Sequence, residues 1–464
     1  MPRWTPDPSF YPSPRMAMSA AEERFAYVAL LEPDQESRPD AIGVIDLDSA
    51  SSSYGSLVST VEMPNAGDEL HHFGWNACSA ALCPSSPRPH VERRYLIVPG
   101  LHSSRVHILD TQPDPLAPTV ARVIEADELA ARTGYSRPHT THCGPDAIYM
   151  SALGGANNAD EGGGVFLLDC DSFDPLGAWE VERDGQRFAY DFWWHLGYDT
   201  MLTSEWGTPS MFENGVVPEK LLGREYGHAM HVWDLRRRRH VKTLDIGDEH
   251  QMVLELRPAH DPRKAWGFVG VVVSVEDLSA SIWLWHRDGD DWAIRKVITI
   301  PAEAAEAERL PELLRGFGAV PPLVTDINLS LDDRFLYISC WGTGDFLQYD
   351  VSDPFSPRLA GKVRLGGIDS RAPHPLSGAL KGGPQMVEVS RDGRRVYVSN
   401  SLYSSWDRQF YPEGLDGWIA KIDVGKNGGM DVDEGFLVTE FDGRLPHQIR
   451  LDGGDSSSDS YCFS

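Results

Sequence analysis

The feature of this sequence that most restricts its fold is a short β-rich run followed by an acidic turn, which recurs along the chain. The copies read GVIDLD, VHILDT, VFLLDC, HVWDLR, IWLWHRD, FLQYDVSD and IAKIDV, and successive copies lie about 50–70 residues apart. Each copy is preceded by a strand-like run, such as YLIVPG, and followed by another, such as TVARVIE. About seven four-stranded units result, and such units close into a β-propeller.

We therefore expect an all-β chain: an extended N-terminal segment over residues 1–24, then a single seven-bladed β-propeller domain over residues 25–464. Helical periodicity is confined to PAEAAEAERLPELLRGF, a predicted helical insertion at 301–317, and to the shorter ADELAART. GHAMHVWDL contains GH and WD, but they lie five residues apart and occur together once. In WD40 repeats these pairs sit at opposite ends of a repeat of about 40 residues, so that family is rejected.

The composition of the chain limits the kinds of partner that it can bind and indicates the cell compartment. The chain has 69 acidic and 42 basic residues and a net charge of −27, which disfavours nucleic acid and anionic membranes. No apolar run reaches the roughly 20 residues of a membrane span, and the N-terminus lacks a basic start followed by an apolar stretch. The six cysteines form no CxxC pair, which predicts reduced thiols and a cytoplasmic protein. The oligomeric state stays open.

Histidines gather at the segments that lead into the predicted blades. DELHHFGWNAC carries His71 and His72, PHTTHCG carries His139 and His142, and LPHQIRLDGGD near the C-terminus carries His447. In a propeller, the loops that enter the innermost strands meet at one mouth of the central channel. These histidines are therefore predicted to form one site, although a lone histidine in a propeller more often caps a turn.

Imidazole ligands suit Zn, Cu, Fe or Ni, and nearby thiols favour copper. Cys78, Cys143 and Cys340 are candidates for that softer environment. Neighbouring residues on a strand point to opposite faces, so His71 and His72 can share one metal only where the backbone is irregular.

Several long stretches then resemble one family. DELHHFGWNAC, HTTHC, YDFWW, DINLSLDDRFLYISCW and SLYSSWDRQFYP are similar to the selenium-binding protein family, which includes methanethiol oxidases. The resemblance implies a seven-bladed propeller that uses copper to convert methanethiol, O2 and water to formaldehyde, hydrogen sulfide and hydrogen peroxide. It implies selenium binding at Cys78. Vertebrate members carry a cysteine where this chain has Ser456. The copper ligands that the resemblance implies are His71, His72, His139 or His142, and His447.

A mechanism follows as a hypothesis. Copper would be held by four histidines, His71, His72, His142 and His447. Cys78 is counted among the catalytic candidates, and Asp326 or Glu205 would act as general base. A small apolar pocket for the methyl group would be walled by four aromatic residues, Phe73, Trp75, Trp206 and Trp341. Two alternatives stay open: a non-catalytic propeller that binds selenium or a metal, and a metal-dependent propeller hydrolase, which would favour carboxylates and Asn at the channel.

Overall fold

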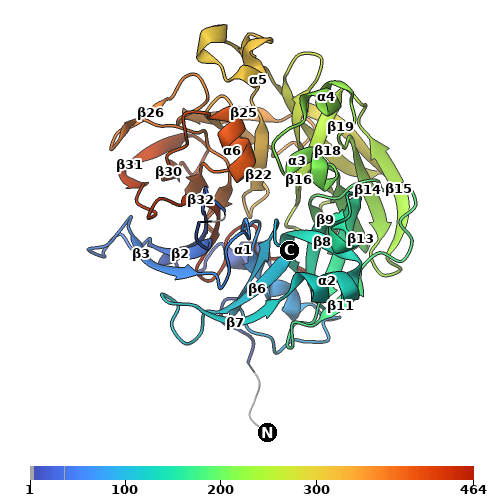
Figure 1. Cartoon of the computed structure of the whole chain (residues 1–464). Helices are drawn as coiled ribbons and strands as arrows, with labels where there is room; N and C mark the ends of the chain where they lie inside the picture. The colour runs from blue at the N-terminus through green and yellow to red at the C-terminus, as the bar shows by residue number, and fades with distance from the viewer. Residues whose placement is uncertain (1–4, 36) are drawn as a thin grey trace.

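Seven four-stranded antiparallel sheets surround a central channel in the computed structural model, which describes residues 5–35 and 37–464 (Figure 1). The predicted seven-bladed propeller is confirmed. The last strand of the chain, β32 (Leu445–Leu451), is the innermost strand of the first blade and pairs antiparallel with β1 (Phe25–Leu31). Tyr27 lies opposite Arg450 in this register. The two ends of the domain therefore close the ring by sharing one sheet.

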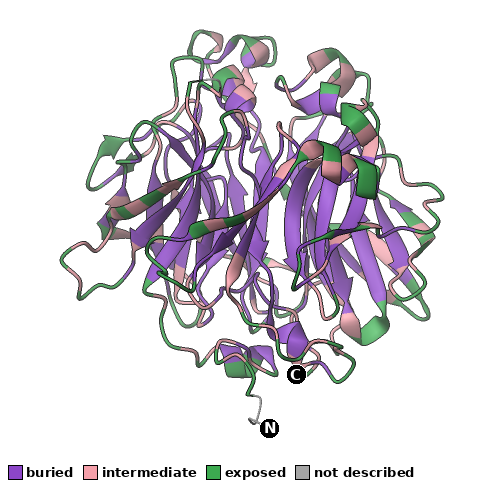
Figure 2. Cartoon of the chain, turned by 60° about the horizontal axis from the view of Figure 1, so that its bottom comes forward, coloured by how far each residue is buried: buried purple, intermediate pink, exposed green. Residues whose placement is uncertain are grey.

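The other innermost strands are β4 (Gly74–Trp75), β8 (Tyr135–Cys143), β12 (Phe192–His195), β16 (His250–Pro258), β22 (Val324–Leu329) and β28 (Val387–Val389). The remaining blade strands are β2 (Ala41–Asp46), β3 (Leu57–Glu62), β5 (Tyr95–Gly100), β6 (Arg105–Asp110), β7 (Thr119–Ile124), β9 (Ile148–Gly155), β10 (Gly162–Leu168), β11 (Pro175–Ala178), β13 (Thr200–Ser204), β14 (Ala229–Asp234), β15 (Arg239–Asp245), β17 (Trp266–Ser274), β18 (Ala280–Asp288), β19 (Asp291–Ile300), β23 (Phe335–Cys340), β24 (Asp345–Asp350), β25 (Arg358–Arg364), β29 (Arg395–Ser399), β30 (Ile419–Val424) and β31 (Met430–Val438). Apolar side chains pack between neighbouring blades, so the core runs around the ring. Figure 2 shows that the strands of the blades consist mostly of buried residues.

The innermost strands all run from one end of the channel to the other. Met252 and Leu323, at the beginnings of β16 and β22, line a cavity at the end that we call upper. His195 and Pro258, at the ends of β12 and β16, line a cavity at the lower end together with Ser457, Ser460 and Tyr461 of the C-terminal tail. Short helices outside the blades are α3 (Pro209–Phe212), α4 (Pro218–Leu222), α5 (Glu312–Arg315) and α6 (Ser404–Phe410).

The N-terminal segment packs against the lower end in its described part. Phe10 and Ala17 are buried, and Asp7 accepts a 2.8 Å hydrogen bond from the backbone N–H of Arg93. The segment contains one helical turn, α1 (Pro14–Ala17), capped by the Ser13 side chain. The described part of the predicted extended segment thus includes one helical turn, and residues 1–4 lie outside the described residues.

The predicted short helical insertion near 301–317 is present, but it is interrupted. The segment forms a two-residue strand pair, β20 (Glu303–Ala304) with β21 (Ala319–Val320), a 3-10 turn at Ala307–Arg309, and α5. Pro311 explains the break, because proline lacks an N–H and disfavours helical backbone in the residue before it. The other predicted helix is confirmed as α2 (Ala126–Thr133), which ends at Gly134 with φ 78°.

One prediction from the cysteine pattern is wrong. Cys83 and Cys462 form a disulfide with a Cα–Cα distance of 5.5 Å, which ties the C-terminal tail to the second blade. The other four cysteines are free and buried. Of the helices in the described part of the chain, none combines the length and the apolar character that crossing a membrane requires.

Candidate metal centre

His71 and His72 lie just before β4 on an irregular backbone. The N–H of His71 donates to the Pro99 carbonyl at 3.0 Å, and the N–H of Phe73 donates to the His71 carbonyl at 2.7 Å, which makes a tight turn at His72. The two neighbouring imidazoles stack with centroids 4.7 Å apart instead of facing opposite ways. A Cβ at Gly74 would lie 2.6 Å from the Thr141 carbonyl oxygen, so glycine is needed there for the close approach to β8.

Two further histidines reach the same place from other blades. His139, on β8, has its ring centroid 4.6 Å from that of His71 and 4.4 Å from that of His72. The ring of His447, on β32, stacks on His71 at 4.2 Å. One ligand atom from each of His71, His72 and His447 lies within 4.8 Å of the other two. These four residues are called the histidine cluster below. His139 and His447 lie on innermost strands, not in the loops where the sequence placed such residues.

Each ring of the histidine cluster is buried and neutral near pH 7. Burial lowers the pKa of His71, His72 and His139 well below the usual value, and lowers that of His447 to about 4. The neutral imidazole is the form that binds a metal, because its lone pair is free.

The cluster also holds four buried ring nitrogens without a hydrogen-bond partner among the described residues. They are His71 Nδ1, His72 Nε2, His139 Nε2 and His447 Nε2. The His447 tautomer is fixed, because its Nδ1–H donates to the Ser401 carbonyl at 2.9 Å and leaves a lone pair on Nε2. Buried polar atoms are normally satisfied, so four such nitrogens in one cluster fit a nitrogen-binding metal.

His142 does not join the cluster. Its Nε2 lies 3.2 Å from Asp191 Oδ1, and its ring packs against Trp193 with centroids 3.9 Å apart. The contacts of His139 and His142 place the two rings on different sides of β8, whose register shifts between Pro138 and Thr141. Of the two histidines that the sequence left as alternatives, His139 is therefore the one beside His71 and His72.

The two predicted general bases are held by other groups. Both oxygens of Asp326 accept hydrogen bonds, from Arg257 Nη2 at 3.1 Å and from the Val387 N–H at 2.7 Å. Glu205 Oε1 accepts from the Phe188 N–H at 3.2 Å and lies 3.0 Å from His231 Nε2. Neither carboxylate is among the described residues that line the cavity beside the cluster.

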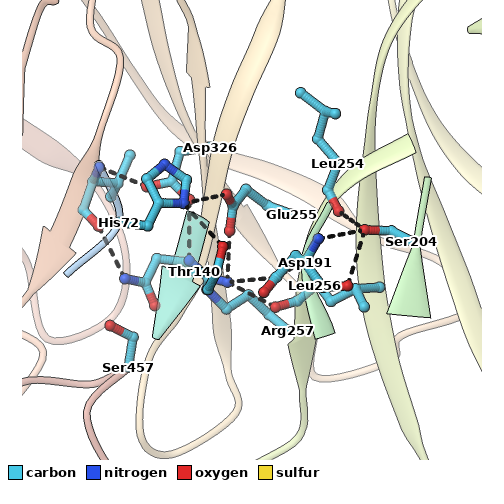
Figure 3. Close-up of polar contacts among 12 residues, drawn as sticks. His72, Thr140, Asp191, Ser204, Leu254, Glu255, Leu256, Arg257, Asp326 and Ser457 are labelled. Atoms are coloured by element: carbon cyan, nitrogen blue, oxygen red, sulfur yellow. Dashed lines mark hydrogen bonds and ion pairs between the residues drawn. The ribbon is translucent and has the colours of Figure 1, made fainter. Parts of the chain in front are cut away.

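The carboxylate closest to the cluster is Glu255, which the sequence reading missed. Its Oε1 lies 3.4 Å from His72 Nδ1, and burial together with Asp191 raises its pKa to about 8. Arg257 binds the other oxygen at 3.0 Å (Figure 3). Glu255 is itself buried within a run of buried residues along β16, an innermost strand. A charged residue type among apolar neighbours in a channel strand was therefore the available signal.

Cys78 lies in a separate group of thiols at the lower end. Its Sγ donates to the Cys143 carbonyl at 2.9 Å, and it packs with Cys143 and Cys83. Burial, with a contribution from Cys78, raises the pKa of the Cys143 thiol well above its usual value. The third candidate thiol, Cys340, is buried between two other blades. These cysteines are thus not ligands in the histidine cluster.

An apolar cavity at the upper end borders His71. Trp206 and Trp341 line it, as predicted, together with Tyr190, Met252, Leu323 and Trp406. The other two predicted wall residues, Phe73 and Trp75, pack instead into the core between the first two blades. One side of His71 therefore borders a cavity whose lining is largely apolar.

A buried ionic network borders the cluster on the other side. Arg257 lies 3.0 Å from Glu255, 3.1 Å from Asp326 and 3.5 Å from Asp191, and all four residues are buried (Figure 3). Farther down, Arg450 pairs with Glu388 and binds Ser457 of the C-terminal tail. The tail thus closes the lower end of the channel with polar contacts.

Fold and site together define a seven-bladed propeller with a buried histidine centre in its channel. Residues 4–462 match the family described as 56kDa selenium binding protein (SBP56), and the chain belongs to that family. A methanethiol oxidase of Xenopus laevis is 39% identical over 97% of both chains, and selenium-binding protein 3 of Arabidopsis thaliana is 36% identical over 97% of this chain and 96% of the relative.

Solved structures agree with this assignment. A hypothetical selenium-binding protein from Sulfolobus tokodaii is 54% identical, with a TM-score of 0.95 over 99% of this chain and 100% of the other. A periplasmic gluconolactonase of Pseudomonas aeruginosa superposes with a TM-score of 0.55 over 92% of this chain and 99% of its own, at 12% identity. At that identity the likeness is one of fold alone, and it does not support the hydrolase alternative.

Proposed function

We propose that the chain is a methanethiol oxidase that converts methanethiol, O2 and water to formaldehyde, hydrogen sulfide and hydrogen peroxide. The observation that carries this proposal is the histidine cluster, with four unpartnered ring nitrogens beside a small apolar cavity. The name methanethiol oxidase on several relatives that are 37–39% identical supports the substrate. The reaction removes two electrons from carbon, and no ordinary side chain accepts them reversibly.

Copper is the proposed acceptor, held by His71, His72, His139 and His447. When bound, copper would supply redox capacity and would lower the pKa of a thiol. Four neutral imidazoles and no carboxylate in the cluster fit copper better than calcium, which prefers oxygen ligands.

The surrounding residues position the site. The Ser401 carbonyl fixes the His447 tautomer, and Glu255 lies beside His72 Nδ1 in the manner of a carboxylate that orients a metal-binding histidine. Trp206 and Trp341 exclude water and contact the methyl group. Glu255 thus replaces Asp326 and Glu205 as the carboxylate of interest, in a positioning role.

The proposal is tested on purified protein by metal analysis and by oxygen uptake with methanethiol. About one copper per chain, with uptake of O2 and formation of formaldehyde and hydrogen peroxide, is the expected result. Copper-free protein that retains uptake, or zinc-loaded protein that hydrolyses a lactone, would overturn it. Protein that binds selenium but does not oxidise the thiol would instead support the alternative of a non-catalytic binding protein. The variant Cys78→Ser tests the predicted position of selenium.

A further inference from the structure

A surface groove at the upper end is lined entirely by apolar residues. Three short helices contribute to it: Leu221 comes from α4, Leu313 from α5 and Phe410 from α6. Leu222 and Phe317 on its walls are 55% and 45% exposed, so the groove opens to solvent. Large exposed apolar side chains that gather at one place on a surface mark a binding site more often than isolated ones do.

The groove lies next to the cavity beside the histidine cluster. Four residues line both of them: Met252, Val272, Leu323 and Trp406. His71 also lines the cavity. The apolar side chains that the groove and the cavity share therefore lie between the surface and the cluster.

Three residues that line the groove have a strained backbone conformation. Met252, Leu278 and Leu323 have φ values of 67°, 60° and 53°, in the left-handed region that bulky side chains rarely adopt. Such strain is commonly found at ligand-binding positions, where the surrounding structure maintains it. Here the N–H of Met252 donates to the Gly227 carbonyl at 2.8 Å, and the Leu323 carbonyl accepts from the Trp341 N–H at 3.0 Å. Two of the three strained residues thus stand where the groove meets the cavity.

We propose that this groove binds the carbon chain of an alkanethiol whose sulfur lies at the histidine cluster, so that the enzyme oxidises thiols longer than methanethiol. The inference rests on the proposed function and names its substrate class. For a thiol R–CH2–SH the balanced reaction consumes O2 and water and yields R–CHO, hydrogen sulfide and hydrogen peroxide. An apolar groove provides no partner for a charged group, and the net charge of −27 opposes anionic thiols.

A chain-length series tests this on the copper-loaded protein. From methanethiol through 1-propanethiol to 1-pentanethiol, kcat/KM is expected to rise by about fourfold for each buried methylene, through KM. The anionic 3-mercaptopropionate, which is close in length to propanethiol, should react at least about tenfold more slowly. A kcat/KM that stays constant or falls as the thiol becomes longer than methanethiol would overturn the inference, and it would leave the proposed oxidation of methanethiol intact.

Two variants test the residues. Leu221→Trp fills the groove and should reduce kcat/KM for pentanethiol at least about tenfold more than for methanethiol, because the displaced chain loses several buried methylenes. Met252→Gly removes a side chain that lines both the groove and the cavity, at a φ that suits glycine. It should raise kcat/KM for pentanethiol relative to that for methanethiol. Leu376→Trp, at an exposed leucine outside the groove, is the matched control and should change neither value.

Binding to the metal-free protein separates this inference from the proposed function. Saturation-transfer NMR should detect 1-pentanethiol on metal-free wild type, with at least about tenfold weaker binding to Leu221→Trp than to Leu376→Trp. Equal binding by the two variants would overturn the groove assignment. Pentanethiol binding without copper uptake or turnover would overturn the proposed function alone.

Discussion

The two sides of the histidine cluster differ in chemistry. The upper side is a cavity lined mainly by aromatic and aliphatic residues, which shares four of them with a surface groove, whereas the lower side is an ionic network centred on Arg257. His71 borders the first and His72 approaches the second, at Glu255. An apolar side can admit a neutral thiol and exclude water, while a charged and hydrogen-bonded side can hold the imidazoles in position. We infer that the substrate reaches the cluster from the upper end of the channel, and that the residues at the lower end hold the metal ligands in position.

The largest expected effect comes from removing a ligand at the boundary. His139→Phe keeps an aromatic ring of similar shape but removes the ring nitrogen, so copper content should fall to near zero and oxygen uptake to background. His142→Gln is the matched control, because His142 lies outside the cluster and glutamine can still donate to Asp191. Copper stoichiometry and O2 uptake measure both variants. Copper loss in the His142 variant with retention in the His139 variant would contradict the assignment.

The next effect tests the lower side. Arg257→Met keeps the volume but leaves Asp191, Glu255 and Asp326 without their cation, which should cost about 3–5 kcal/mol of unfolding free energy in urea. Arg263→Met, which breaks an exposed pair with Asp261, is the control and should leave stability unchanged. An equally small effect for Arg257→Met would mean that the network does not hold the lower side together.

A pH effect concerns α6 on the upper side. Asp407 there is buried and bonded to the Ser401 hydroxyl and to the Leu402 N–H, and burial raises its pKa to about 7. The folded chain therefore keeps a proton that the unfolded chain loses near pH 4. The stability this proton contributes is complete below about pH 4 and is lost as the pH rises through 7, to a total of at most about 4 kcal/mol.

Asp407→Asn cannot titrate, so the wild type should lose more unfolding free energy than this variant between pH 5 and pH 8. Denaturant titrations at the two pH values measure the difference. Identical losses in the two proteins would show that Asp407 is ionised in the fold throughout this range.

The smallest expected effect tests whether Glu255 helps to hold His72 in position. Glu255→Gln keeps the shape of the side chain but replaces the carboxyl group beside His72 Nδ1 with an amide that cannot ionise when the metal binds, and should weaken copper binding by about 10–100-fold. Competition with a chelator measures the affinity, with Glu303→Gln, on β20 away from the channel, as control. An unchanged affinity would rule out a positioning role for Glu255.

The sequence predicted the ring and its number of blades because each blade repeats a local pattern of strands and turns. It also brought together His71, His72 and His447 from positions far apart, since the channel strands of different blades converge. The choice between His139 and His142 was not accessible, because it depends on which side of β8 faces the channel and that strand is irregular between Pro138 and Thr141.

Other features could not be predicted for related physical reasons. The Cys83–Cys462 disulfide joins residues 379 positions apart, through a tail with no periodic pattern. Glu255 was hidden among apolar neighbours on β16, and the groove is built by short helices whose placement depends on tertiary contacts. The helical insertion predicted at 301–317 is interrupted because Pro311 breaks a stretch whose composition favours a helix.

The most direct test of the central claim is a crystal structure of the copper-loaded protein with anomalous diffraction measured at the copper edge. We expect one strong peak within about 2 Å of ring nitrogens of His71, His72, His139 and His447, beside the apolar cavity. A peak beside Cys78 and Cys143, or no peak in protein that still oxidises methanethiol, would contradict it.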